Sequence, residues 1–297
     1  TDLGLLAVVF ICALNLSIVK MAVEAMKPLA FNGVRFALAS ATLLLLVRGR
    51  GESYAVPKND LFRLIALGLM GHTLYQICFI EGLARTTASH TALIFGTSPV
   101  IVALLSQLLG HEQVGGAAWM GAVLAFAGEY LIIAGKAPTG GPAPSLAGDL
   151  LVLAAACWWC LYTVLAQPLL SRHSPLKVTA LSMAWGFLAL APLCVPSLLE
   201  QEWRRVSPMV WASTLYSCFF ALVLAYILWY RSVHKVGNVR TAVYSNLVPV
   251  TGTLAGWLFL GEKLYPTLLL GAAAIFGGIV LTRWKRAPIE ESVPAAD

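Results

Sequence analysis

Charged residues are scarce in this chain of 297 residues: Asp, Glu, Lys and Arg together account for 11% of it, against about 25% in soluble domains. Hydrophobic residues account for 59%. Ten membrane-spanning helices of about 21 residues each would use about 210 residues, which leaves room only for short connections. The composition therefore excludes a separate nucleotide-binding domain or other large soluble domain and predicts a membrane protein.

The signatures of catalysis are also absent from the sequence. It contains neither an HExxH zinc motif nor a GxSxG nucleophile motif. All six cysteines fall within apolar runs, where thiols pack as small hydrophobic groups. Cys157 and Cys160 have CxxC spacing, but no second pair of ligands accompanies them. We therefore expect no enzyme activity, no metal site and no cofactor.

The basic residues are not gathered into one segment. The 20 Lys and Arg residues, which leave a formal net charge of +6, are scattered singly between apolar runs, so we do not expect a nucleic acid partner. If ten spans alternate across the membrane, twelve of these residues lie on the side of the two termini and seven on the other side. Cytoplasmic loops are enriched in Lys and Arg, so both termini are expected in the cytoplasm.

Ten apolar runs, separated by polar residues, glycine or proline, have the length of membrane-spanning helices. The first is long and lacks a basic segment before it, so we interpret it as a retained helix and not as a signal peptide. The runs cover about residues 3–22, 28–47, 61–83, 88–109, 115–135, 148–169, 176–197, 208–230, 238–260 and 264–284.

The two halves of the chain repeat each other. At an offset of 150 residues, 12 of the 41 positions from 91 to 131 are identical, among them Pro99 with Pro249, Glu112 with Glu262, and Gly121 with Gly271. A repeat of five spans must cross the membrane in the opposite sense, and such inverted repeats are common in secondary transporters. We expect repeats at 1–137 and 148–286, a linker at 138–147 and a cytoplasmic tail at 287–297.

These motifs resemble the EamA-type drug/metabolite transporters. The resemblance includes Pro28 followed by Arg35-Phe36 in the second run, Pro99 in the fourth, and the paired Pro, Glu and Gly positions of the two halves. It implies an all-α membrane protein with ten transmembrane helices, arranged as two inverted five-helix repeats around a central cavity. It also implies export of amino acids, metabolites or drugs, with the bacterial YddG-type exporters of aromatic amino acids as the most similar group, and a multi-pass protein of the bacterial inner membrane.

Candidate cavity residues come from polar and aromatic positions on shared helix faces. In the third run, His72, Tyr75, Gln76 and Phe79 fall at i, i+3, i+4 and i+7. Such a stripe suits an aromatic or zwitterionic solute, although His72 and Gln76 would also serve as bonds between helices. In the sixth run Trp158 pairs with Tyr162 at i+4, and Trp158 is preferred over Trp159 as a cavity residue. The other candidates are Asn15, Phe95 and Tyr244.

Proline and buried charge mark further positions. Pro99 and Pro249 each remove a backbone donor in mid-membrane, so both helices should bend there, either as gates or as static kinks. Glu112 and Glu262 follow these helices, where a carboxylate caps the next helix or binds a proton; we favour the cap. Arg35, Glu81 and Glu129 lie within spans and need partners or water, and Arg35 would pair with a carboxylate of the protein or of a solute.

The sequence thus predicts a secondary transporter that exports small amphiphilic solutes, including aromatic amino acids, by alternating access. Its partners would be the solute and membrane lipid, and a monomer is plausible, with the oligomeric state open. The alternatives are an exporter of drug-like or phosphorylated metabolites, an intramembrane enzyme and an open channel. A phosphate carrier would need several buried Lys or Arg residues, whereas only Arg35 qualifies.

Overall fold

The computed structural model describes residues 2–86, 91, 94–134, 145–248, 250–251 and 266–283, and within these residues it is helical, with no strand. Pro249, Glu262, most of the expected linker and the C-terminal tail lie outside the described residues. The first half contributes α1 (Asp2–Ala25), α2 (Pro28–Gly49), α3 (Lys58–Gly68), α4 (Tyr75–Arg85), α6 (Ser98–Leu108) and α7 (Gly116–Ala134). The second half contributes α8 (Leu146–Leu165), α9 (Gln167–Leu170), α10 (Pro175–Leu199), α11 (Pro208–Tyr216), α12 (Ala225–Val236), α13 (Asn238–Val243) and α15 (Pro266–Arg283).

Among the described residues, five helical runs are long and apolar enough to cross a membrane: Pro28–Gly49, Lys58–Arg85, Leu146–Leu170, Pro175–Leu199 and Pro208–Val236. Shorter apolar helices cover Asp2–Asn15, Ile94–Leu108 and Leu269–Thr282. The prediction of an all-helical, multi-pass membrane protein is confirmed at this level. Ten spans and their inverted arrangement remain predictions.

Two of the described helices begin where the sequence supplies both a capping hydroxyl and a proline. Ser174 precedes Pro175 and accepts a bond from the backbone N–H of Lys177, and Ser207 precedes Pro208 and accepts one from Val210. Proline at the first helical position loses no intrahelical bond, and the serine satisfies one free N–H group. These starts fix where α10 and α11 enter the bundle.

Two long helices contain a π-helical segment. In one, η1 (Leu69–Leu74) joins α3 to α4, and in the other η3 (Ser217–Leu224) joins α11 to α12. At the repeat offset of 150, residues 69–74 correspond to 219–224, which lie within η3. A π segment holds an extra residue in a wide turn and is frequent near functional sites. Both segments therefore change which side chains face the centre of the bundle.

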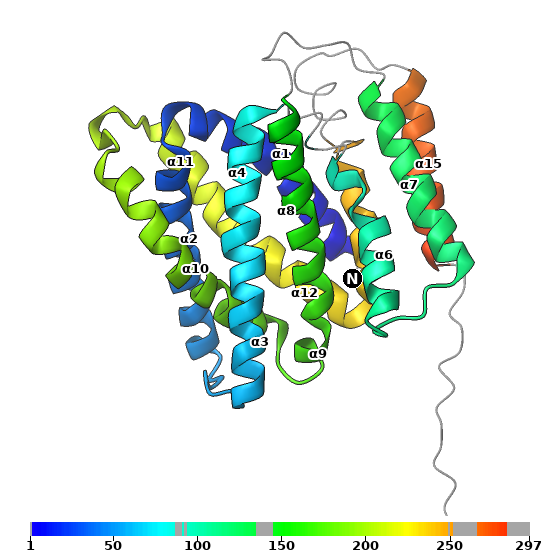
Figure 1. Cartoon of the computed structure of the whole chain (residues 1–297), viewed down its shortest axis with the longest axis horizontal. Helices are drawn as coiled ribbons and strands as arrows, with labels where there is room; N and C mark the ends of the chain where they lie inside the picture. Colours follow the sequence, from blue (N-terminus) through cyan, green and yellow to red (C-terminus); the bar gives the residue numbers. More distant parts are fainter. Residues whose placement is uncertain are drawn as a thin grey trace, which may run out of the picture.

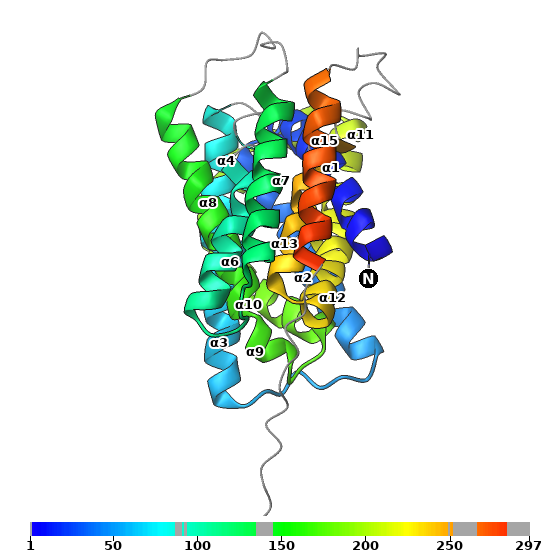
Figure 2. The same cartoon turned by 90° about the vertical axis from the view of Figure 1, so that its right-hand side faces the viewer.

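Glycines bring α7 and α15 together, and the two helices lie side by side in both views (Figures 1 and 2). A Cβ atom added at Gly121 would come 2.6 Å from the carbonyl oxygen of Gly278, and one added at Gly128 would come 2.5 Å from that of Gly271. Only glycine permits backbones to approach this closely. A similar contact joins α3 to α10, where a Cβ at Gly186 would lie 2.5 Å from Gly68 O.

Candidate functional site

A cavity of about 200 Å³ lies among α1, α2, α4, α7, α8, η3, α12 and the short 3-10 helix η4 (Tyr244–Asn246). Its wall is mostly apolar, with Leu5, Val8, Val9 and Cys12 from α1 and Ala221, Leu222 and Ala225 from η3 and α12. Both halves of the chain contribute to it. The cavity therefore lies between the two halves, which is where secondary transporters built from repeats bind their solutes.

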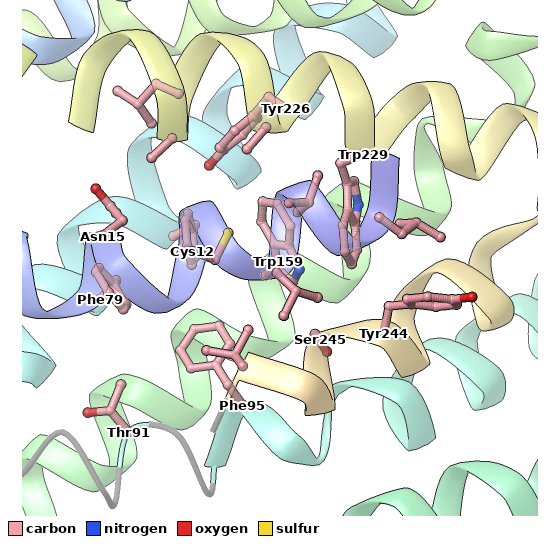
Figure 3. A pocket seen from close by; sticks show the side chains of 18 of the residues that line it. Cys12, Asn15, Phe79, Thr91, Phe95, Trp159, Tyr226, Trp229, Tyr244 and Ser245 are labelled. Atoms are coloured by element: carbon pink, nitrogen blue, oxygen red, sulfur yellow. The ribbon is translucent and has the colours of Figure 1, made fainter. Parts of the chain in front are cut away.

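Aromatic rings form much of the cavity wall. Figure 3 shows the lining rings of Phe79, Phe95, Tyr226, Trp229 and Tyr244, with Trp159 in the middle of the view. The ring of Trp159 contacts three other lining rings, with centroid distances of 5.4 Å to Tyr75, 5.4 Å to Tyr226 and 5.3 Å to Trp229. Tyr75 also stacks on Phe79 at 5.7 Å. Such a wall offers flat apolar area with a few polar edges, which suits an aromatic or amphiphilic solute.

Arg35 is the one basic residue among the described residues that line the cavity. It is buried in α2, with 2% of its surface exposed. Its guanidinium group donates to Asn32 Oδ1, Ser217 Oγ and Gln76 Oε1, each at 2.8 Å. All three partners are uncharged, and in the described part of the chain no carboxylate forms an ion pair with Arg35. The rings of Phe31 and Phe36 also lie near the guanidinium, at 4.9 and 5.6 Å from its central carbon. The guanidinium is therefore held in place by uncharged groups, and no described anion neutralises its positive charge.

Glu129 is the one carboxyl group among the described residues that line the cavity. It belongs to α7 and is 2% exposed. Its Oε2 atom is buried without a hydrogen-bond partner and packs on Gly96, where an added Cβ atom would come 2.0 Å from it. An isolated carboxylate in such a place is costly. The group therefore needs a cation, which the described residues do not supply.

Six of the candidate residues line this cavity in the structure: Asn15, Tyr75, Gln76, Phe79, Phe95 and Tyr244. His72, Trp158 and Tyr162 are not among its lining residues. His72 and Tyr162 are fully buried beside the cavity, with their ring centroids 4.9 Å apart, and His72 also contacts Tyr226 at 5.3 Å. In α8, Trp159 and not Trp158 supplies the indole ring that reaches the cavity.

The π segment explains why His72 departs from the expected face. Residues three apart, such as His72 and Tyr75, share a face only if the helix is a regular α-helix. Here His72 lies within the π segment η1, and Tyr75 begins α4. A π turn advances by a smaller angle per residue than an α turn. His72 therefore turns toward α10, where its Nε2 lies 3.4 Å from Ser182 Oγ, while Tyr75, Gln76 and Phe79 face the cavity.

Proline acts at the beginning of a helix. Pro99 lies in the first turn of α6, after a turn at Thr97 that ends the helical residues 94–96. The helix is therefore interrupted next to Phe95 and Gly96, both of which line the cavity. Pro249 lies outside the described residues.

Glu112 caps a helix of the other half of the chain. The predicted cap was on the helix that follows it, but its Oε1 accepts a bond from the backbone N–H of Asn238, at the start of α13. Gly237 makes this approach possible, because its φ is 88° and an added Cβ would lie 2.9 Å from Glu112 Oε1. Burial raises the pKa of the Glu112 carboxyl, which the bonds from Asn238 and Val239 partly offset.

Other charged residues form pairs away from the cavity. Glu81 pairs with Arg85 one turn later at 2.5 Å, near the end of α4. Asp60 accepts from Arg172 at 2.8 Å and from His173 at 2.9 Å. No group of three or more His, Cys, Asp or Glu residues able to hold a metal occurs in the described part of the chain.

The amino-acid sequence is similar to a known protein family and to individual proteins of other organisms. The model of the EamA-like transporter family matches the chain twice, at residues 1–134 and 146–284. The transporter YetK of Bacillus subtilis, described as uncharacterized, is 28% identical over 94% of this chain and 84% of its own length. A protein of Salmonella typhimurium named "Probable amino-acid metabolite efflux pump" is 29% identical over 93% of this chain and 92% of its own length.

A solved crystal structure has a similar fold. Its TM-score to this chain is 0.76, at 22% sequence identity, and the match covers 95% of this chain and 96% of the other. The likeness therefore extends over both halves of the molecule.

Proposed function

Because the chain belongs to the EamA-like transporter family, we propose that it is a secondary transporter that exports small amphiphilic solutes, aromatic amino acids among them. The solute would bind in the cavity around Trp159, and the two halves would alternate in exposing that cavity to either side of the membrane. The name of the Salmonella relative, an amino-acid metabolite efflux pump, is consistent with this substrate class.

The observation that carries this proposal is the state of Arg35. A buried guanidinium with three neutral partners is held rigidly and still attracts an anion. Bonds between an ionised donor and a carboxylate are among the strongest in proteins. The aromatic wall beside Arg35 would hold the side chain of the same solute. A carboxylate attached to an aromatic or apolar body matches both features.

The proposed architecture has ten spans in two inverted repeats, 1–137 and 148–286, joined by residues 138–147. Two separate matches of one family model support a duplicated chain. The glycine contacts of α7 and α15 support a two-fold relation, because Gly121 meets the counterpart of Gly128, and Gly128 meets the counterpart of Gly121. A two-fold axis generates this kind of exchange. We place the protein in the bacterial inner membrane, with both termini in the cytoplasm.

Counterflow in proteoliposomes tests the proposed function. Vesicles that contain the purified protein are loaded with unlabelled phenylalanine, and the entry of labelled phenylalanine is measured at several concentrations. We expect saturable entry that empty vesicles lack. Absence of entry for phenylalanine and for other amino acids would contradict the proposal, and entry of an amphiphilic drug alone would move the substrate class to drug-like solutes.

Arg35→Gln tests the role of the guanidinium in the same assay. It should raise the half-saturation concentration for phenylalanine by about tenfold or more, while leaving phenethylamine, which has no carboxylate, less affected. Arg205→Gln is the matched control, because Arg205 is exposed and pairs with Glu202. Equal losses for both solutes, with a lower yield of folded protein, would assign Arg35 a structural role only.

A further inference from the structure

Glu129 lines the cavity but has no part in the proposed binding of the solute carboxylate by Arg35. It lies in the same cavity as Arg35, but no ion pair joins the two in the described part of the chain. Arg35 keeps its charge beside three neutral partners, and Glu129 keeps a buried oxygen atom without any donor. Each group is therefore available to a ligand of opposite charge.

The surroundings of Glu129 limit which cation fits. The elements packed against α7 in the described part of the chain include α6, α13, η4 and α15, and the helical residues 94–96, which carry no ionisable side chain, approach Glu129 through Gly96. The sequence of α6 contains no ionisable residue, and that of α15 contains only Arg283 at its last position. In α13, Arg240 donates to the carbonyl oxygen of Thr282, and in η4 the Tyr244 hydroxyl donates to Asp2. Arg240 forms no ion pair with Glu129 among the described pairs.

A metal ion would find too few ligands here. The remaining ionisable groups of the cavity wall are Arg35 and the side chains of Cys12, Tyr75 and Tyr226. Hard cations require several oxygen ligands, whereas one carboxylate packed against Gly96 offers two. A proton needs only one oxygen atom, and an ammonium group can approach from the open cavity. Both are singly positive, and both would neutralise the carboxylate.

We infer that Glu129 is a cation site that a proton and the ammonium group of the transported solute occupy in turn. In the empty carrier, the carboxylate takes a proton from water in the cavity and becomes a neutral carboxylic acid. When a solute with an amino group arrives, this proton returns to water, and the ammonium pairs with the carboxylate. This inference rests on the proposed transport function and deepens it, because it makes the carrier an exchanger of protons for amino solutes.

Competition between a proton and the ammonium group of the solute for Glu129 determines whether acid raises or lowers the half-saturation concentration. Acid on the side that the cavity faces favours the protonated carboxyl, so it should raise the half-saturation concentration of solutes that carry an ammonium group. A solute without an amino group does not compete with the proton, so acid should not raise its half-saturation concentration. Phenylalanine and 3-phenylpropionate differ by this amino group alone, which makes them a matched pair.

The experiment measures counterflow of both solutes between about pH 6 and about pH 8, so that the proton concentration changes by about a hundredfold, in the unaltered protein, in Glu129→Gln and in Glu81→Gln. Glu81 is the control, because it is a helical carboxylate that pairs with Arg85 and does not line the cavity. We expect a rise of about tenfold on acidification for phenylalanine only, in the unaltered protein and in Glu81→Gln but not in Glu129→Gln. A rise that persists in Glu129→Gln, or no rise in the unaltered protein, would overturn the inference.

A second measurement needs no variant and therefore does not depend on its folding. Carbodiimides modify buried, protonated carboxyl groups, and the modified residue can be identified by mass spectrometry. Phenylalanine should protect Glu129 of the unaltered protein from modification at least severalfold more than 3-phenylpropionate does. Equal protection would overturn the inference while leaving transport itself intact. Loss of all amino-acid counterflow would instead contradict the proposed function, so the two failures are distinguishable.

Discussion

Gly121 of α7 and Gly278 of α15 meet backbone to backbone, and the contact is reciprocal. A Cβ at Gly121 would lie 2.6 Å from Gly278 O, and a Cβ at Gly278 would lie 2.5 Å from Gly121 O. Two helical turns further along α7, Gly128 makes the same kind of contact with Gly271. The two helices thus pack through equivalent positions of the two halves, and this packing holds Glu129, the next residue after Gly128, against the cavity.

Gly278→Ala should destabilise the protein, since the new methyl group has no space between the two backbones. Overpacking of this kind costs about 1–3 kcal/mol, which thermal unfolding in detergent would detect. Gly277→Ala is the control, because its nearest neighbour would be Leu124 at an ordinary contact distance of 3.5 Å. Equal unfolding temperatures for the two variants would contradict the close contact of α7 with α15.

Trp159→Ala should weaken transport of aromatic amino acids more than that of alanine or serine. The ring of Trp159 contacts three aromatic neighbours in the cavity wall, and an aromatic contact contributes about 0.5–1.5 kcal/mol beyond buried area. A rise of about fivefold in the half-saturation concentration is expected. Trp158→Ala, a change of the adjacent residue outside the cavity lining, should leave this selectivity unchanged, and the reverse result would favour Trp158 as the cavity residue.

Tyr75→Ala should have a similar selective effect, because its ring lies between Phe79 and Trp159 in the cavity wall. Tyr75→Phe keeps the ring and should retain most of the transport of aromatic solutes. The comparison separates the ring from the hydroxyl group. Equal impairment of large and small solutes by Tyr75→Ala, together with a lower unfolding temperature, would indicate a packing role alone.

Glu112 should make stability depend on pH. Burial raises the pKa of this carboxyl in the folded protein, so folding favours its protonated form, and stability falls as the pH rises through that pKa. Glu112→Gln keeps an oxygen acceptor for Asn238 N–H without the charge, and it should remove this fall. Glu112→Ala leaves the N–H unpaired and should cost about 1 kcal/mol. Unfolding temperatures of the three proteins between pH 4 and 8, about the range in which carboxyl groups with raised pKa titrate, provide the test.

Membrane orientation is open to a direct test with introduced cysteines. The connection between α2 and α3 and that between α10 and α11 lie at opposite ends of the bundle (Figures 1 and 2). Ser53 and Arg204 are exposed residues in these connections. If both termini are cytoplasmic, an impermeant thiol reagent should label Arg204→Cys in intact cells and should label Ser53→Cys only after the cells are broken. The unaltered protein controls for its six cysteines, and the opposite pattern would reverse the orientation.

The sequence predicted the helical membrane fold because apolar runs of span length have few alternatives in a chain with so little charge. It also placed Tyr75, Gln76 and Phe79 on one face, and these residues do line one cavity. Their spacing lies within α4, a regular α-helix. Prediction from spacing therefore succeeds where the helix is regular.

Prediction failed where the structure depends on irregular or distant contacts. The π segment η1 separates His72 from the face of Tyr75, and no residue pattern marked that segment. The capping partner of Glu112 is Asn238, 126 residues later, so local sequence pointed to the wrong helix. The neighbours of Glu129, such as Gly96, come from another helix. Sequence alone showed that this carboxyl needed a partner and could not show that it faced the cavity.

The π-helical winding of η3 determines how Ser217, the partner of Arg35, is placed relative to the ring of Tyr226. Ser217, which accepts a bond from Arg35, and Tyr226, which belongs to the aromatic wall, are nine residues apart. In a regular α-helix, nine residues turn the chain by about 900°, which would leave these side chains on opposite sides. The extra residue of the π segment removes roughly 100° of this separation. Unwinding or rewinding a single turn would therefore rotate the Tyr226 ring relative to the Arg35 guanidinium, so torsion within this one helix would reshape the cavity without moving either half of the molecule as a whole.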